Sequence, residues 1–175
     1  MDWDSKKIKK RPSFPEEVTS LSKILVVYES KYGNTKRVAE TIVTGMQGVE
    51  GTETALSEVK KVDRKAITSY DAIVYGGPTH FGGPTRSMKK FIDTLSSLPL
   101  DGKQFAVFDT YFKTDFEKAT KNMEQRMREK VPAMKMVVPG LSIKVADMKG
   151  PIVEGELPKC EEFGATIASQ LRPSG

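Results

Sequence analysis

The alternation of short apolar runs with amphipathic stretches constrains the fold of this chain more than any other feature of its sequence. Residues 24–28, 72–75 and 105–108 are continuous apolar runs of strand length, as expected of parallel strands buried on both faces. Between the first two runs, apolar residues recur at helical spacing, with Ala39 and Ile42 as examples. Because helices that connect parallel strands cover both faces of a sheet, the pattern predicts a three-layer α/β fold.

Five strands are expected, and two of them are less regular than the others. Residues 52–59 are too polar for the centre of a sheet, and residues 134–145 form a strand interrupted near Pro139 and Gly140. The polar second strand suits the edge of a sheet in the order 2-1-3-4-5, which places a ligand site beyond the carboxyl ends of strands one and three. The later helices are expected on three apolar stripes: Met88, Phe91, Ile92 and Leu95; Phe116, Ala119, Met123 and Met127; and Cys160, Phe163, Ile167 and Leu171.

The positive charge of the chain is concentrated near its start. The net charge is +5, and residues 1–11 contain five basic and two acidic side chains. We therefore expect residues 1–22 to form a basic N-terminal extension and residues 23–175 to form one domain. A charge run of this kind is typical of a solvated arm. The alternative is an arm that binds a polyanion such as nucleic acid, anionic lipid or an acidic protein.

The single cysteine, Cys160, cannot form an internal disulfide and favours a reducing, cytoplasmic location. It falls on the apolar face of the last expected helix, where a thiol is usually buried and inert. A membrane-spanning helix needs about 20 mostly apolar residues, and no such run is present in the sequence. No apolar run follows the first lysines, so we expect neither membrane insertion nor a secretory signal.

The first candidate ligand loop follows the first strand and precedes the first helix. Its hydroxyl groups can donate hydrogen bonds to phosphate oxygens, and backbone N–H groups at the start of a helix form an anion site. The alternative is an ordinary connection in which Thr35 caps the helix. The loop is neither a Walker A motif nor a dinucleotide fingerprint. Its residues are Ser30, Lys31, Tyr32, Gly33, Asn34 and Thr35.

This loop carries a family resemblance. Residues 26–42, which read VVYESKYGNTKRVAETI, resemble the flavodoxin signature through the strand, the loop and the first helical turns. The resemblance covers residues 23–171 and implies a flavodoxin-like fold with FMN as the cofactor. It also implies that residues 30–35 hold the 5′-phosphate of FMN.

The second candidate loop follows the third strand and resembles the Pro-Thr-x-Phe-Gly loop of flavodoxin-like quinone reductases. Gly76 and Gly77 precede it and would let a flat ring approach the backbone. The resemblance implies that a peptide of this loop turns its carbonyl toward the flavin, although an ordinary surface turn is the alternative. His80 is the only histidine and is expected to be an exposed loop residue or a contact to the flavin edge. The residues assigned to the cofactor here are Pro78, Thr79, His80, Phe81, Gly82 and Gly83.

The third candidate loop follows the fourth strand and consists of Asp109, Thr110, Tyr111 and Phe112. The resemblance implies that an aromatic ring from this loop packs on the second face of the flavin. Tyr111 is the first candidate for that ring and Phe112 is the second. Asp109 is expected either to accept a hydrogen bond from the flavin or its ribityl chain, or to cap the next turn.

The resemblance implies an FMN-binding electron carrier that shuttles single electrons between redox partner proteins. No acid–base constellation or metal cluster is visible in the sequence, which favours a carrier over an enzyme with its own substrate. Because the chain is basic, acidic partners such as ferredoxin-like proteins are expected. Nucleic acid is not an expected partner. One alternative is an FMN-dependent NAD(P)H:quinone oxidoreductase or a related flavodoxin-like oxidase. Another is an FMN-free module whose basic tail binds polyanions.

Overall fold

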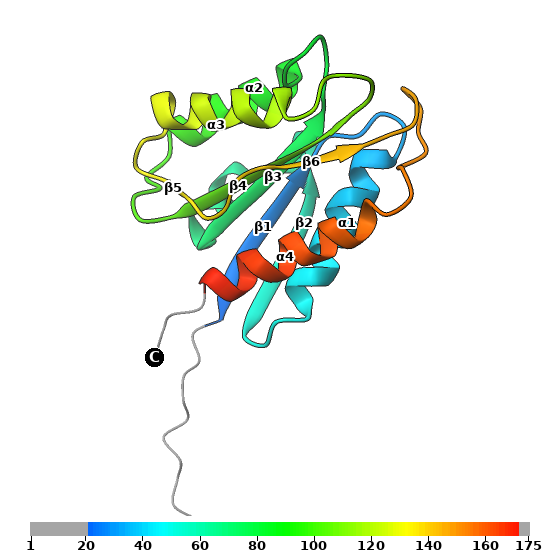
Figure 1. Cartoon of the computed structure of the whole chain (residues 1–175). Coiled ribbons are helices and arrows are strands. Elements are labelled where there is room, and N and C mark those ends of the chain that lie inside the picture. Colours follow the sequence, from blue (N-terminus) through cyan, green and yellow to red (C-terminus); the bar gives the residue numbers. More distant parts are fainter. Residues whose placement is uncertain (1–20, 172–175) are drawn as a thin grey trace, which may run out of the picture.

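The computed structural model describes residues 21–171, in which strands and helices alternate (Figure 1). The predicted basic extension therefore lies outside the described residues except for Leu21 and Ser22. The elements in chain order are β1 (Ser22–Tyr28), α1 (Asn34–Gln47), β2 (Thr52–Glu58), the 3-10 helices η1 (Val59–Lys61) and η2 (Arg64–Ser69), β3 (Ala72–Pro78), α2 (Arg86–Ser96), β4 (Gln104–Tyr111), α3 (Lys118–Lys130), β5 (Lys135–Met136), β6 (Leu141–Lys144) and α4 (Leu157–Leu171).

The sheet is parallel and has the predicted order, β2-β1-β3-β4-β5. Val26 at its centre pairs with Leu56 of β2 on one side and Val74 of β3 on the other. The polar strand β2 pairs with β1 and lies at the edge, as expected. The interruption at Pro139 and Gly140 divides the last strand position, because β5 and β6 pair with successive parts of β4.

Helices cover both faces of the sheet. Helices α1 and α4 lie together on one face, and α2 and α3 lie on the other (Figure 1). Each face has its own apolar core, one built on Ile24, Val26 and α1, the other on Leu25, Val27 and α2. This distribution follows from right-handed crossovers. Because β2 lies on one side of β1 and β3 lies on the other, the connection from β1 to β2 and the connection from β2 to β3 cover opposite faces. Between residues 21 and 171, no helix combines the length and the apolar character that crossing a bilayer requires.

Helix α3 begins later than its apolar stripe predicted. Ala119, Met123 and Met127 are buried as expected, but Phe116 lies before the helix with 55% of its surface exposed. Glu117 precedes the first helical residue and has a φ of 61°, which ends the helical geometry there. The ring of Phe116 instead contacts Tyr111, with 5.5 Å between the centroids. The stripe was therefore right for three of its four residues.

Cys160 is buried on α4, in agreement with the sequence prediction. Burial, followed by the nearby carboxylate of Glu156, raises the pKa of its thiol to about 12. The thiolate is the reactive form of cysteine, so this thiol is unreactive at neutral pH.

Candidate functional site

The loops after β1, β3 and β4 leave the end of the sheet toward which the strands point (Figure 1). Residues of these loops line a cavity of about 430 Å³. Its volume falls within the range of small-molecule and cofactor sites, about 300–1,000 Å³. All three predicted loops contribute to its wall. The predicted residues that line it are Ser30, Lys31, Tyr32, Asn34, Thr35, Pro78, Thr79, His80, Phe81, Thr110, Tyr111 and Phe112.

The first loop presents the start of α1 to the cavity. The residue before the helix is Gly33, whose φ of 93° favours glycine. No side chain caps this N-terminal end of α1. The Gly33 N–H donates to Ser30 Oγ over 3.1 Å, so the Ser30 hydroxyl hydrogen stays available to a ligand. The first N–H groups of an α-helix have no acceptor within the helix. This end of α1 can therefore hold a phosphate group.

Thr35 is not the helix cap that the alternative reading required. It is the second residue of α1 and only 2% of its surface is exposed. Its Oγ1 lies 2.8 Å from Oγ1 of Thr110, and both residues line the cavity. Because each hydroxyl has one hydrogen, the pair can satisfy itself and still donate one hydrogen bond to a ligand. This buried pair also fixes the first loop against the third.

The second loop contains a tight turn with a polar group beside it. His80 and Gly83 exchange backbone hydrogen bonds of 2.7 and 3.1 Å, and the residues between them, Phe81 and Gly82, have φ of 50° and 73°. Two positive φ values define a type I′ turn. Phe81, at the tip, is 98% exposed. Thr79 Oγ1 is buried without a hydrogen-bond partner among residues 21–171, so a ligand in the cavity could supply one.

The glycines of this segment differ in part from their expected roles. Gly82 and Gly83 do not line the cavity, and the positive φ values of this turn fall on Phe81 and Gly82. A Cβ on Gly76 would lie 2.1 Å from the carbonyl oxygen of Phe108. Gly76 is therefore required by the close approach of β3 and β4.

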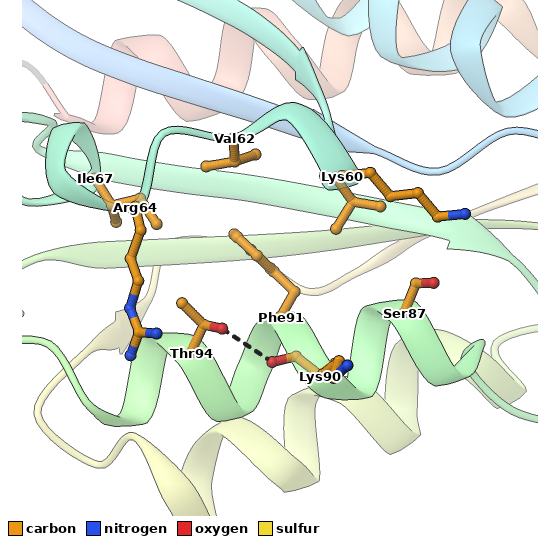
Figure 2. A pocket seen from close by; sticks show the side chains of 9 residues that line it. Lys60, Val62, Arg64, Ile67, Ser87, Lys90, Phe91 and Thr94 are labelled. Carbon is orange, nitrogen blue, oxygen red and sulfur yellow. Dashed lines mark hydrogen bonds between the residues drawn. The ribbon is translucent and has the colours of Figure 1, made fainter.

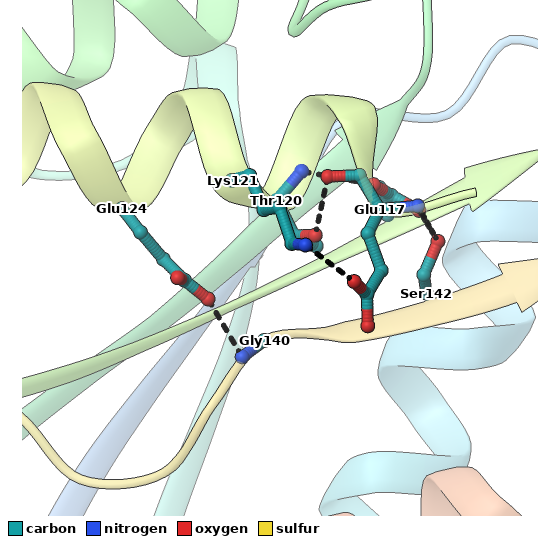
Figure 3. A network of polar contacts seen from close by, with 7 residues as sticks. Glu117, Thr120, Lys121, Glu124, Gly140 and Ser142 are labelled. Atoms are coloured by element: carbon teal, nitrogen blue, oxygen red, sulfur yellow. Dashed lines mark hydrogen bonds and ion pairs between the residues drawn. The ribbon is translucent and has the colours of Figure 1, made fainter. Parts of the chain in front are cut away.

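Asp109 does not reach the cavity, which corrects its assignment to the cofactor. Its carboxylate is fully buried and accepts hydrogen bonds from the Thr120 N–H (2.9 Å) and from Ser142 Oγ (2.6 Å). Ser142 Oγ also accepts from the Glu117 N–H, so this network joins the start of α3 to β6 (Figure 3). Of its two expected roles, Asp109 therefore has the second, that of capping the next turn. Burial is the largest cause that raises its pKa to about 6, and the two hydrogen bonds oppose that shift.

We expect Asp109 to make the protein less stable as pH rises from 4 to 7. Its pKa of about 6 in the folded protein exceeds the ordinary value of 3.8, so its stabilising contribution is complete below about pH 4 and is lost as pH rises through 6. The shift corresponds to about 3 kcal/mol. Urea unfolding at several pH values measures it: the stability of Asp109→Asn relative to wild type should increase with pH by this amount. Parallel pH profiles would contradict the expectation.

Four residues that line the cavity were missed from the sequence: Lys113, Asp115, Val145 and Met148. Val145 and Met148 follow β6, and this fourth loop reaches the cavity because β6 pairs with the end of β4. Gly150 in this loop lies against Asn34, where an added Cβ would lie 2.6 Å from the side-chain oxygen. The apolar residues in the second half of the segment 134–145 could have indicated this loop, because they form the separate strand β6. The sequence analysis interpreted the whole segment as one interrupted strand.

Comparisons with known proteins agree with this arrangement. The family model for a flavodoxin domain matches residues 25–144. A flavodoxin from Aquifex aeolicus is 34% identical over 93 residues, which is 51% of this chain and 50% of the relative. A protein of Chromohalobacter salexigens named NAD(P)H dehydrogenase (quinone) is 32% identical over 104 residues, which is 47% of this chain and 52% of the relative. This chain thus spans about half the length of these curated relatives.

The fold is also similar to solved structures. A flavodoxin from the domain Archaea aligns with a TM-score of 0.75 and 28% identity, covering 86% of this chain and 99% of the other. The alignment includes nearly all of the described sheet and helices, so the similarity concerns the whole domain and not one motif.

Proposed function

This chain belongs to the flavodoxin family, and we propose that it binds FMN in the cavity described above and carries single electrons between redox partner proteins. Members of the family bind FMN, as the sequence led us to expect. The observation that carries the proposal is the uncapped start of α1 beside the Thr35–Thr110 hydroxyl pair, at one wall of a cavity that two further loops complete.

The residues present fit this cofactor. The N–H groups at the start of α1, with Ser30 and Thr35, would hold the phosphate. The buried hydroxyl of Thr79 would find a polar partner, and the aromatic side chains Tyr111 and Phe112 would flank the ring system. Bound FMN would supply one-electron redox chemistry, and the protein would orient it and tune its environment. The predicted loop residues that line the cavity are proposed as the contacts to FMN.

Three lysines lie over aromatic rings that line the cavity, and the acidic residue of the lining, Asp115, pairs with Lys118, which favours acidic partners. Lys31 and Lys149 each place their ammonium group within 6 Å of the Tyr32 ring centre, at 5.4 and 5.8 Å, and Lys113 does so over Phe112 at 5.2 Å. Within residues 21–171, none of these three lysines forms an ion pair. An acidic protein, for example a ferredoxin-like one, would neutralise them on docking and would be drawn to this face by long-range attraction.

We expect electron transfer to a small acidic iron–sulfur protein to slow when these lysines are neutralised. In the triple variant Lys31→Gln, Lys113→Gln and Lys149→Gln, the second-order rate at low ionic strength should fall roughly tenfold, since charge steering sets the association rate. Stopped-flow absorbance of the FMN-loaded protein measures this rate. Added salt should slow the unaltered protein and barely affect the variant.

The matched control is Lys23→Gln, Lys65→Gln and Lys135→Gln, which removes the same charge from exposed positions outside the cavity. Its rate should stay within about threefold of the unaltered protein, because steering depends most on the charges around the docking face. Equal rates for the two triple variants would refute the acidic-partner proposal. If the protein reduced quinone directly with NADPH in a steady-state assay, an NAD(P)H:quinone oxidoreductase function would be favoured over electron carriage. The family match does not favour that alternative.

The remaining parts of this proposal are a basic extension at residues 1–22, an FMN-binding domain at residues 23–175 and a cytoplasmic location. The concentration of lysine and arginine in residues 1–11 supports the first. The free, buried thiol of Cys160 is compatible with a reducing compartment. The FMN-free module would be indicated instead by nucleic-acid binding that is steeply salt-dependent and lost on deletion of residues 1–11.

A further inference from the structure

The crossover from β2 to β3 is thinner than the other connections of the sheet. Parallel strands are usually connected by an α-helix, but here residues 59–69 form only the short helices η1 and η2. These two helices share one face of the sheet with α2 and α3. A cavity of about 320 Å³ remains between this crossover and α2 (Figure 2). It shares no lining residue with the proposed FMN cavity.

The interior of this second cavity is apolar. Phe91 rises from α2 into the space, and Val62 and Ile67 lie opposite it on the crossover (Figure 2). Tyr75 of β3 holds Phe91 in place, because the two rings pack edge-on with 5.3 Å between their centroids. Phe91 and Ile67 are 5% and 1% exposed, so they form the fixed floor of the cavity, and the partly exposed Val59 and Val62 supply the rest of its apolar surface.

The rim of the cavity carries three cations, and no acidic residue is among the described residues that line it. Lys60 and Lys90 are exposed and form no ion pair with any residue between 21 and 171. The guanidinium of Arg64 donates to Ser97 Oγ, which holds it beside the end of α2. The nearest acidic side chain along α2, Asp93, pairs with Lys130 of α3 instead.

We propose that this cavity is a second binding site, which takes a medium-chain carboxylate. The apolar chain would lie against Phe91, Val62 and Ile67, and the carboxylate would meet the cations of the rim. An amphipathic anion is the occupant that satisfies both features, because an apolar interior rewards buried surface and unpaired cations reward negative charge. The volume is near the lower end of the range for small-molecule sites, about 300 Å³, which excludes long-chain carboxylates.

Calorimetric titration of the full chain with octanoate tests this proposal, with and without added FMN. Octanoate should bind with one-to-one stoichiometry in both conditions, whereas octyltrimethylammonium (the same chain with a positive head) and acetate (the same head without the chain) should not saturate. The double variant Lys60→Gln and Lys90→Gln should bind octanoate roughly fivefold more weakly, as expected of two partly exposed ion pairs.

Two further variants sharpen the result. Lys65→Gln with Lys89→Gln removes the same charge from the same two segments at positions that do not line the cavity, and should change the affinity less than twofold. Thr94→Leu places extra side-chain volume at the wall and should abolish binding. Saturable binding of octyltrimethylammonium, absence of octanoate binding, or equal effects of the two double variants would each overturn the proposal. Because FMN-free protein is included, failure here is distinct from failure of the proposed function.

Discussion

Replacing Thr35 by valine is expected to weaken FMN binding thirtyfold to a hundredfold. Valine has nearly the same shape but no hydroxyl, so the change removes the bond to Thr110 and the donor offered to the phosphate. A hydrogen bond to a charged group contributes about 1.5–3 kcal/mol, and leaving Thr110 without its buried partner adds to the loss. Quenching of flavin fluorescence on titration of the apoprotein measures the dissociation constant.

Controls separate the hydroxyl from the fold. Thr35→Ser keeps the donor and should bind FMN within a few fold of the unaltered protein. Thr44→Val lies on the same helix, but its hydroxyl bonds to the Glu40 carbonyl at the surface, so FMN affinity should not change. Riboflavin lacks the phosphate and should bind the unaltered protein and Thr35→Val equally weakly. If Thr35→Val bound FMN as tightly as the unaltered protein did, the phosphate would not be held at the start of α1.

Replacing Gly45 by alanine is expected to lower the free energy of unfolding by about 3 kcal/mol or more, the upper range for overpacked cores. A Cβ on Gly45 would lie 1.9 Å from the carbonyl oxygen of Glu161 on α4. The reciprocal contact has the same form, since a Cβ on Gly164 would lie 2.0 Å from the Ile42 carbonyl oxygen. Helices α1 and α4 can therefore approach this closely only with glycine at both positions.

Urea unfolding measures the effect, and Gly48→Ala is the matched control. Gly48 ends the same helix with a φ of −71°, and an added Cβ would come no closer than 3.4 Å to its neighbours. Alanine there should raise stability by about 0.4–1 kcal/mol, because the unfolded chain loses freedom. In an unpacked helix alanine is favoured over glycine by about 1 kcal/mol. A Gly45→Ala variant as stable as the unaltered protein would mean that the two helices pack further apart.

Local pattern was sufficient for the order of the strands and the position of the cavity. The apolar runs could only be buried strands, and the polarity of residues 52–59 placed β2 at the edge. The loop that contains Ser30 and Thr35 was a candidate because its hydroxyls flank a glycine at the start of a helix, and its resemblance to the flavodoxin signature implied that it holds a phosphate. These features lie within a few residues of one another, so a linear sequence displays them.

Other features depended on residues far apart in the chain. The sequence could not tell which of its two readings held for Asp109, because its partners, Thr120 and Ser142, come from α3 and β6. Nor could it show that Gly76 is required by Phe108 across the sheet. The fourth wall of the cavity, with Met148, was missed because it depends on which half of a divided strand pairs with the end of β4.

By itself, therefore, the sequence determined the layers, the strand order and the loop that we expect to hold a phosphate, since hydrophobic period and turn chemistry are local properties. Only the tertiary structure decided the role of Asp109, the paired glycines between α1 and α4, and the second cavity beside Phe91. Each of these depends on how closely distant segments approach, and that distance is set by packing of the whole domain rather than by any short stretch of chain.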